Sequence, residues 1–419
     1  MSNQHAFQTG TSVVVEKCQV CDYPALEPIL FLGYLPPVNK MHKIGEKPCE
    51  DSSYPAQLLY CPKCHLTQLG LTVDAKILFP PEYPYTSSTT KILRENFADL
   101  YKECIGLMDI GSNDLVVDIG SNDGNLLSNF KDKHRVLGIT PEEIGKIAID
   151  RGIPTIIDYF TGDVVKKVLS EHGHAKIITA TNVFAHIENI NDIVDNILEL
   201  LGKDGIFISE SHYLLSLIET LQYDTIYHEH LRYYSLHSLK YLLEMHGLEI
   251  IHARRIPTHG GSIRVYTSRK GSFPVRESVN ALLEEEKPVV TNRENLLKFK
   301  ERVIISKLEL LAMLHDIKKK GKTIYGISAP SRASTLINYT AIDDGILDYV
   351  LEIRGSHKIG KYVPGTVIPV VEESLLFENQ PDYALLLSWH IADELITNLN
   401  KKGYKGEYIV PLPVPKIVK

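Results

Sequence analysis

Short apolar runs that alternate with helical patterns fill most of the chain. Between about residues 90 and 265, the runs LVVDIG, RVLGIT, KIITATNV and GIFISES are each short and continuous. Such runs, separated by amphipathic segments, indicate buried parallel strands joined by helical crossovers. A second series follows residue 320, with the runs KTIYGISA, LDYVLEI, YALLLSW and EYIVPLP. The pattern therefore predicts an α/β protein with two α/β regions.

Two further segments have other patterns. Residues 18–80 are Pro-rich and irregular, with short apolar runs such as AQLLY. Residues 276–320 have a helical pattern, and we expect Pro288 to break that helix because proline lacks an N–H group. A chain of 419 residues exceeds one typical domain. We expect three domains, which cover residues 1–80, 81–265 and 266–419.

The charge balance and the apolar segments exclude several classes of protein. A net charge of −7 argues against a non-specific nucleic-acid binder, which needs a basic surface. The N-terminal residues lack the pattern of a secretory signal, and no window approaches the roughly 20 apolar residues that span a bilayer. Four of the six cysteines form CxxC pairs, which suits a reducing compartment. We expect a cytoplasmic monomer that binds neither nucleic acid nor membrane.

The two CxxC pairs, Cys18 with Cys21 and Cys61 with Cys64, have the spacing of zinc knuckles. Together they offer four thiolates to one tetrahedral Zn²⁺ ion. A redox CxxC motif is the alternative, but neither pair opens a helix after a strand. A site with four thiolates is closed, so we predict a structural zinc that takes no part in chemistry.

A glycine-rich loop follows the first strand of the middle region, in DLVVDIGSNDGNLL at residues 114–127. Glycines let the backbone turn sharply and approach a ligand. The G-x-x-x-G spacing differs from the dinucleotide pattern, and two aspartates in the loop would repel a pyrophosphate. A sulfonium with an amino group suits such a loop, so we predict S-adenosylmethionine in place of NAD. The expected contacts are Asp118, Gly120, Ser121, Asn122 and Gly124.

The carboxyl ends of the next strands should line the ligand crevice of an open α/β sheet. An acid at the end of RVLGIT would bind the donor ribose, but Thr140 stands there, with Glu142 and Glu143 shortly after. The ribose contact is therefore left open. In ATNVFAHI, we expect Asn182 to contact the donor, and His186 to be either a functional residue or a capping or core histidine.

The densest run of ionisable and aromatic side chains is YDTIYHEHLRYYS, residues 223–235. It contains four tyrosines and two histidines and offers little to fill a core. A solvated helix face would use Lys and Glu, whereas His exchanges protons near neutral pH. The run is therefore a candidate for general acid–base chemistry.

Several motifs occur in one order over nearly the full length. They are the paired CxxC motifs, DIGSNDGNLL, ATNVFAHI, YDTIYHEHLRYYS, THGGSIRVY and NYTAID. In this order they resemble the nucleotide-sugar C-methyltransferases of deoxysugar biosynthesis. The resemblance implies an N-terminal zinc-binding domain, a Rossmann-like S-adenosylmethionine domain and a C-terminal Rossmann-like α/β domain that binds a nucleoside-diphosphate sugar. It also implies methylation of a 4-keto sugar at C3, or at C5 as in some members.

This reaction accounts for the composition of residues 223–235. A carbon next to a ketone must lose a proton before it attacks a sulfonium methyl group, which needs a base and donors to the enolate oxygen. By match to the family motif, His230 is the base, with Tyr227 and Glu229 as close partners. A neighbouring carboxylate can fix the tautomer of the base. His186 would help to hold the sugar.

The resemblance also implies residues that bind the substrate. The segment FPPEYPYTSSTT resembles a family segment that brings Tyr83 or Tyr85 into the site. A positive charge in the loop YGISAPSRASTLINY can grip phosphate in bidentate fashion. For the turn in THGGSIRVY, substrate contact and a purely structural role are both open. The candidates for substrate binding are His259, Arg332, Asn338, Arg354 and Lys358.

Two other functions fit parts of the sequence. Zinc knuckles with a methyl-donor fold also suit an RNA methyltransferase, which would need a basic face with aromatic platforms. A scaffold that kept the fold and lost activity would suit Thr140 and the altered loop around Arg332. The acidic balance argues against the first, and the intact YHEH motif and glycine loop argue against the second.

Overall fold

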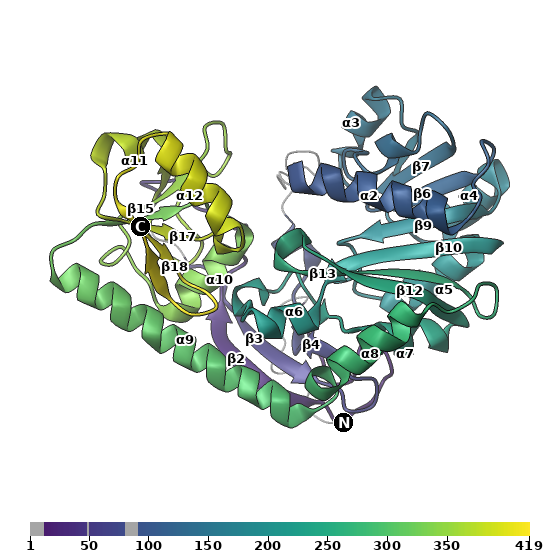
Figure 1. Cartoon of the computed structure of the whole chain (residues 1–419), viewed down its shortest axis with the longest axis horizontal. Coiled ribbons are helices and arrows are strands. Elements are labelled where there is room, and N and C mark those ends of the chain that lie inside the picture. Colours follow the sequence, from purple (N-terminus) through teal and green to yellow (C-terminus); the bar gives the residue numbers. More distant parts are fainter. Residues whose placement is uncertain (1–11, 48–49, 80–90) are drawn as a thin grey trace.

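The computed structural model describes residues 12–47, 50–79 and 91–419, which form four β-sheets with helices around the larger ones (Figure 1). A seven-stranded sheet and a six-stranded sheet lie in two separate lobes, and a four-stranded sheet lies below and between them (Figure 1). Within these described ranges, no helix is long and apolar enough to cross a membrane. The predicted domain boundaries near residues 80 and 265 stay a prediction.

The middle region forms the seven-stranded sheet, in the order β12-β13-β10-β9-β6-β7-β8. Its parallel strands are the predicted ones, with one addition: β6 (Leu115–Ile119), β7 (Arg135–Thr140), β8 (Thr155–Ile157), β9 (Ala175–Thr181) and β10 (Leu201–His212). The helices of this region are α2 (Lys91–Leu107), α3 (Gly145–Asp150), α4 (Gly162–His172), α5 (Ile190–Leu200), α6 (Leu214–Glu219) and α7 (Leu236–Met245).

One edge of this sheet differs from the expected parallel arrangement. Strands β12 (Leu248–Ile256) and β13 (Ser262–Arg269) form an antiparallel hairpin, and β13 also pairs antiparallel with β10. The chain between them is the short THGG turn, and a parallel pair would need a crossover of a dozen or more residues. The expectation of a purely parallel sheet is therefore wrong at this edge.

The C-terminal region forms the six-stranded sheet, in the order β16-β15-β14-β17-β18-β19. The strands are β14 (Ile324–Ile327), β15 (Tyr349–Glu352), β16 (Val370–Glu372), β17 (Tyr383–Leu386), β18 (Glu407–Val410) and β19 (Lys416–Val418), and only β19 runs antiparallel to its neighbour. Its helices are α10 (Ser331–Thr340), α11 (Ser374–Asn379) and α12 (Ala392–Lys401). The strand order reverses between β14 and β17, where an open α/β sheet binds its ligands.

Two helices connect the lobes, and the break between them lies later than predicted. Helix α8 (Glu277–Val290) contains Pro288 in its last turn, and α9 (Arg293–Lys319) begins after Asn292. The Asn292 side chain accepts a hydrogen bond from the Glu294 amide at 2.9 Å, which satisfies a free donor of the helix start. A new N-cap therefore sets the break, and the prediction of a break at Pro288 is wrong. Helix α9 runs along the outside from one lobe to the other (Figure 1).

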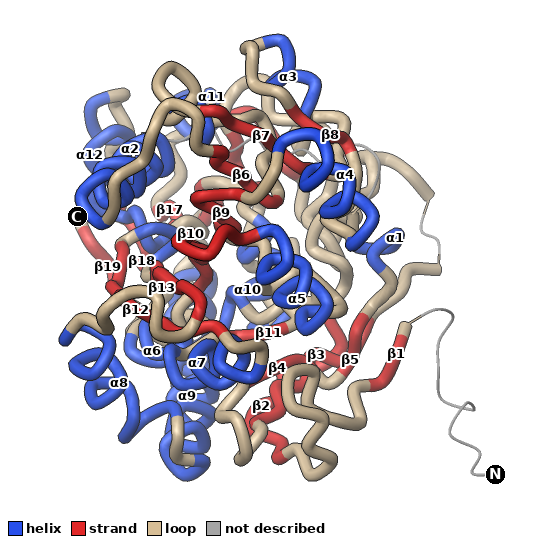
Figure 2. The backbone as a smooth tube through the Cα atoms, turned by 90° about the vertical axis from the view of Figure 1, so that its right-hand side faces the viewer, coloured by secondary structure: helices blue, strands red, loops and turns tan. Residues whose placement is uncertain are grey.

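The N-terminal region is more regular than its sequence suggests. Strands β2 (Glu27–Leu35), β3 (Tyr54–Tyr60) and β4 (Thr67–Leu69) form an antiparallel sheet, and a separate pair joins β1 (Val13–Val14) to β5 (Leu71–Thr72). A short helix, α1 (Ala75–Leu78), follows. The fourth strand of the sheet is β11 (Arg232–Tyr233), which belongs to the run 223–235. Figure 2 shows β11 beside β4 at the meeting of the two regions.

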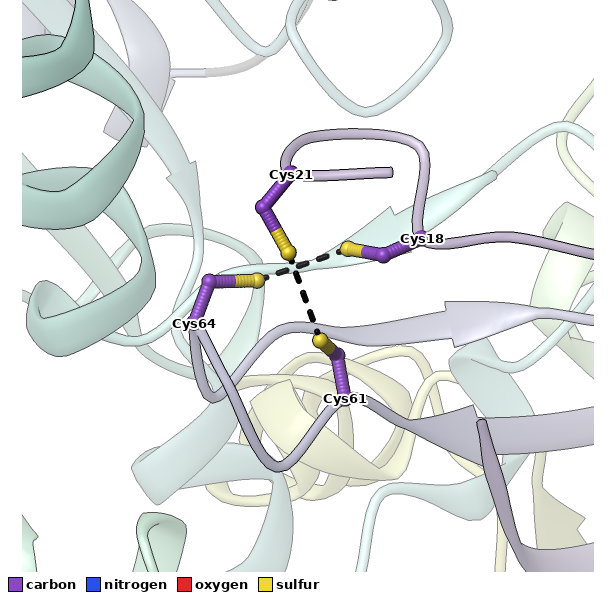
Figure 3. A group of neighbouring side chains, drawn as sticks. All are labelled: Cys18, Cys21, Cys61 and Cys64. Carbon is purple, nitrogen blue, oxygen red and sulfur yellow. Dashed lines mark hydrogen bonds between the residues drawn. The ribbon is translucent and has the colours of Figure 1, made fainter. Parts of the chain in front are cut away.

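The four CxxC cysteines meet at one point, where their Sγ atoms point toward one another (Figure 3). All four are buried, and their Sγ atoms lie within 4.8 Å of one another. The Sγ–Sγ distances are 3.4 Å for Cys18 with Cys64 and 3.6 Å for Cys21 with Cys61. Tetrahedral Zn²⁺ with Zn–S bonds of about 2.3 Å places its sulfurs roughly 3.8 Å apart. The cluster therefore fits one zinc ion without a large rearrangement.

Removal of one thiolate should release the zinc and destabilise the N-terminal sheet, because a structural site contributes folding free energy directly. We expect the zinc content of the Cys61→Ser variant to be below one ion per chain, and its thermal unfolding to occur at a lower temperature than that of the wild type. Elemental analysis and thermal unfolding measure both. Cys104→Ser is the matched control: Cys104 is also buried but lies outside the cluster, so this variant should keep its zinc. Zinc-free wild-type protein, purified without chelator, would contradict the assignment.

Candidate active site

His230 has one ring nitrogen fixed by the backbone. It follows the 3₁₀ turn η4 (Tyr223–Thr225), and its Nδ1 lies 2.9 Å from the carbonyl oxygen of Thr225. A carbonyl can only accept, so this contact selects the tautomer in which Nδ1 carries the proton. Nε2 then holds the free lone pair. Thus the atom that could act as a base is selected by the fold.

Three more histidines surround His230. The ring centroids of His186 and His212 each lie 5.0 Å from that of His230, and His259 stacks on His212 at 5.5 Å. The Tyr227 ring lies against His230 with its centroid 4.3 Å away. The cluster joins the carboxyl ends of β9 and β10 to the THGG turn and the run 223–235. All five side chains thus face one location.

Burial keeps these imidazoles neutral. Burial, and then the neighbouring His186, lower the pKa of His230 to about 3. Burial lowers the pKa of His186 and His259 to about 4, and lowers that of His212 well below its ordinary value. A buried imidazolium loses its hydration, which is why the charged form is disfavoured. At neutral pH each ring is therefore available as a base or as a neutral hydrogen-bond partner.

The two middle members of the YHEH motif, His228 and Glu229, contact the N-terminal region. The His228 Nε2 lies 3.2 Å from the carbonyl oxygen of Pro55, in the N-terminal sheet. The Glu229 carboxylate accepts a hydrogen bond from Asn39 Nδ2 at 2.7 Å. The expectation that a carboxylate fixes the tautomer of His230 is wrong, because the Thr225 carbonyl occupies Nδ1. Glu229 instead connects the motif to the N-terminal region.

His212 is a site residue that the sequence reasoning missed. It ends the strand β10, after the run GIFISES, so it lies at the same sheet edge as Asn182 and His186. The signal was available: a histidine directly after a predicted parallel strand falls on the ligand side of the sheet. Its neighbour Glu210 is fully buried and binds Arg264, with 2.6 Å between Oε1 and Nε. Arg264 Nη2 also donates to the backbone and side-chain oxygens of Asn96, at 3.1 and 2.8 Å, so Arg264 ties the hairpin β12–β13 to helix α2.

The glycine loop has the tight geometry that a close ligand approach requires. Gly120 has φ +72°, and a Cβ there would lie 2.5 Å from the Val183 side chain. Gly124 has φ +77°, and a Cβ there would lie 2.7 Å from Ile153. Asn122 also has a positive φ, of 51°. Only glycine fits the first two positions, so the loop retains its sharp turn.

The two aspartates of the loop have different surroundings. Asp118, at the end of β6, accepts a hydrogen bond from Thr179 Oγ1 at 2.6 Å, and burial raises its pKa to about 7. The Asp123 carboxylate is fully buried and lies 3.0 Å from Arg151 Nη1. Asp123 is therefore neutralised, and only Asp118 supports the argument that the loop repels a pyrophosphate.

Other predicted donor contacts lie around the same loop. Ser121 Oγ and Asn182 Oδ1 are buried without a hydrogen-bond partner among the described residues, so each can bind a ligand. Thr140 is buried at the end of β7. Glu142 is half-buried, and its pKa is raised by burial, whereas Glu143 is exposed and pairs with Lys146. Glu142 is thus the more buried of the two carboxylates that follow β7.

Arg332 does not have the arrangement expected of a phosphate ligand. It is buried, and its Nε and Nη2 each donate to the carboxylate of Asp224 at 2.8 Å. Nε and Nη2, the two donors that would bind a phosphate, are therefore occupied by a carboxylate from the run 223–235. Arg332 makes a bidentate contact, but with Asp224 of the protein and not with the phosphate that we predicted as its partner.

The remaining C-terminal candidates have three different roles. Asn338 Nδ2 donates to the carbonyl oxygens of Ser334 and Pro364, so it holds the backbone together. Arg354 is exposed on the surface. The Lys358 Nζ donates to the carbonyl oxygen of Ala329, in the loop after β14, and burial lowers its pKa. Of these three residues, Lys358 is the one that brings a cation to the loop after β14. Tyr83 and Tyr85 lie outside the described residues.

The chain matches three family models in succession. They are described as "Putative zinc binding domain" over residues 18–79, "Methyltransferase domain" over residues 91–253 and "C-methyltransferase C-terminal domain" over residues 257–413. The first contains the four-cysteine cluster, and the second contains the glycine loop and the strands β6 to β10 of the seven-stranded sheet.

Known proteins also resemble the chain. The C-methyltransferase NovU of Streptomyces niveus is 30% identical over 410 residues, which cover 96% of this chain and 97% of that protein. A solved structure from Pyrococcus horikoshii has a TM-score of 0.37 at 14% identity, and covers 46% of this chain and 98% of its own. Magnesium protoporphyrin IX methyltransferase from Synechocystis has a TM-score of 0.33 at 12% identity, over 42% of this chain and 79% of its own. On the full-length match and the three family models, the chain belongs to the S-adenosylmethionine-dependent C-methyltransferases that carry an N-terminal zinc-binding domain.

Proposed function

We propose that the protein methylates a carbon next to the ketone of a nucleoside-diphosphate-linked 4-keto-deoxysugar. The acceptor carbon is C3, with C5 as the alternative. The observation that carries the proposal is the fixed tautomer of His230, whose free Nε2 is surrounded by neutral rings and the Tyr227 side chain. The order of motifs shared with nucleotide-sugar C-methyltransferases supports the sugar substrate.

In this proposal His230 removes the acidic proton of the substrate. Nε2 takes the proton from the carbon beside the ketone, and the electron pair moves toward the ketone oxygen. The low pKa of the free imidazole makes it a weak base, so the enolate oxygen needs strong stabilisation by hydrogen-bond donors. Tyr227 and His186 are the adjacent candidates. A bound diphosphate would also favour the imidazolium, because a nearby negative charge raises a histidine pKa.

The methyl donor is assigned to the glycine loop. When bound, S-adenosylmethionine supplies an electrophilic methyl group. Asp118, Gly120, Ser121, Asn122 and Gly124 would hold it, together with Asn182. The sharp turns at the two glycines support a close backbone approach, and Asp118 supplies a carboxylate for a cationic ligand.

The nucleotide end of the substrate is assigned to the C-terminal sheet. The start of helix α10 follows β14 at the switch point, and helix N-termini favour phosphate groups. The Lys358 ammonium group binds the loop that precedes this helix. His259 Nε2 is buried without a partner among the described residues, and it could meet the sugar between the two lobes.

The proposed function is tested by incubation with labelled methyl donor. Purified protein would be offered a panel of TDP- and GDP-linked 4-keto-deoxysugars, and NMR of the product would locate the new methyl group. We expect transfer to a carbon beside the ketone of one or more of them. Transfer to RNA and to none of the sugars would contradict the proposal.

Asp118→Asn should weaken donor binding, because a hydrogen bond that involves a charged group typically contributes about 1.5–3 kcal/mol. That corresponds to a Kd raised by roughly ten- to hundredfold. Because burial raises the Asp118 pKa to about 7, the carboxylate becomes protonated as the pH falls below 7, and wild-type affinity should fall there too. This pH dependence should vanish in the variant. Calorimetry measures both effects, with the exposed Asp132→Asn as control. Equal affinities would remove Asp118 from the donor site.

His230→Gln should lower kcat by about 10²–10⁴-fold, which is the usual contribution of a general base. Donor affinity should stay near the wild-type value, because the donor site is the glycine loop. His228→Gln is the matched control, since it changes a histidine of the same motif whose ring faces Pro55. Steady-state kinetics and calorimetry measure the two effects. Equal losses of kcat in both variants would mean that the motif, and not the base, had been disturbed.

A further inference from the structure

Asp224, a buried carboxylate of the run 223–235, connects this run to the C-terminal lobe. Asp224 is fully buried in η4, one residue before Thr225. Its two oxygens accept from Nε and Nη2 of Arg332 at 2.8 Å, and one of them also accepts from Trp389 Nε1 at 2.7 Å. Arg332 lies on α10 and Trp389 on η6 (Trp389–Ile391), so all three donors come from the C-terminal region.

The Arg332 guanidinium is held on every side. Besides Asp224, its Nη2 donates to Gln222 Oε1 at 3.1 Å, and its Nη1 lies 3.1 Å from His390 Nδ1. Its Cζ lies 5.0 Å from the centre of the Trp389 ring. These contacts fix the planar guanidinium in one orientation. A lysine ammonium group is a compact charge and could not make the same set of hydrogen bonds.

The two residues that Arg332 holds lie next to the carbonyl that orients His230. The Thr225 amide and its Oγ1 both donate to the Gln222 carbonyl oxygen, at 3.1 and 2.8 Å. The Thr225 carbonyl in turn accepts from His230 Nδ1 at 2.9 Å. Arg332 thus holds the first and third residues of a four-residue turn, and the carbonyl of the last residue, Thr225, selects the tautomer of His230.

Gln222 also reaches the THGG turn. Its Nε2 donates to the Gly260 carbonyl oxygen at 2.6 Å, and a Cβ at Gly260 would lie 2.6 Å from Gln222 Oε1. This turn carries His259, which stacks on His212. The contacts of Gln222 therefore link Arg332 to the turn that holds His259 against His212.

We infer that Arg332 is a positioning residue of the methyl transfer. From the C-terminal lobe it holds Asp224 and Gln222, so that the Thr225 carbonyl meets His230 Nδ1 and leaves Nε2 free. This inference rests on the proposed role of His230 as the base. The C-terminal lobe therefore completes the catalytic machinery in addition to any part it has in substrate binding.

The tautomer can be tested without any substrate. In protein labelled with ¹⁵N-histidine, NMR distinguishes an imidazole protonated at Nδ1 from one protonated at Nε2, and the signal lost in His230→Gln identifies His230. We expect a single Nδ1–H form in the wild type. Arg332→Lys keeps the charge but not the fork, so we expect the Nε2–H form of His230 to appear.

Kinetics separate positioning from phosphate binding. If Arg332 positions the base, Arg332→Lys should lower kcat by on the order of 10²-fold, as small misplacements of catalytic groups do. The KM for the nucleotide sugar should change little. A direct phosphate contact would instead raise KM and leave the His230 tautomer unchanged. Arg293→Gln is the control, since its exposed ion pair with Glu27 at 3.1 Å lies outside this network.

Asp224→Asn weakens the same Arg332–Asp224 contact by changing the acceptor, so the Nε2–H form of His230 should appear in this variant too. If Arg332→Lys fails to fold, as judged by circular dichroism and zinc content, the Asp224→Asn variant tests whether this contact positions His230. An unchanged Nδ1–H signal of His230 in every folded variant would overturn the inference. Because that signal needs no substrate, a wrong assignment of the sugar would leave this outcome readable.

Discussion

The run 223–235 is buried along its whole length, and this burial is the constraint on which the rest of the structure depends. A polar group withdrawn from water costs free energy unless it finds a hydrogen-bond partner. The partners come from three regions of the chain. Pro55 and Asn39 of the N-terminal region bind the YHEH motif, and Arg332 binds Asp224 from the C-terminal lobe. The Arg232 guanidinium donates to the carbonyl oxygens of Ile187 and Glu188, in the middle region. One segment therefore brings all three regions together.

The same burial determines the chemistry. Removing several imidazoles from water keeps them neutral, and a backbone carbonyl then decides which nitrogen of His230 holds the proton. The zinc cluster acts at a distance from this centre. Two of its cysteines lie in the loop between β3 and β4, and β4 pairs with β11 of the run 223–235. A structural metal is thus connected to the active site through a strand pair and not through any ligand it shares.

The sequence predicted the features that repeat at short range. The parallel strands, the four-cysteine cluster and the glycine loop each follow from local spacing, and each is present. The antiparallel hairpin β12–β13 was missed because strand direction depends on the connection and not on the apolar run. The fourth strand of the N-terminal sheet, Arg232–Tyr233, was missed because it comes from more than 150 residues further along the chain.

The sequence indicated which residues meet near His230 better than it indicated their hydrogen-bond partners. His230, His186 and Tyr227 meet as expected, yet Glu229 and Arg332 have partners that no spacing could reveal. Both contacts cross between regions that are far apart in sequence. The position of His212 could have been inferred, since it ends a predicted strand on the ligand side.

The central claim is that His230 removes a proton from the carbon beside the ketone. Hydrogen exchange tests it most directly, because it isolates this step from methyl transfer. The enzyme would be incubated in deuterated water with the nucleotide sugar and the demethylated donor product, and NMR would follow the substrate hydrogens. The account predicts exchange at the acceptor carbon by the wild type and by His228→Gln, and none by His230→Ala. Exchange by His230→Ala at the wild-type rate would contradict it.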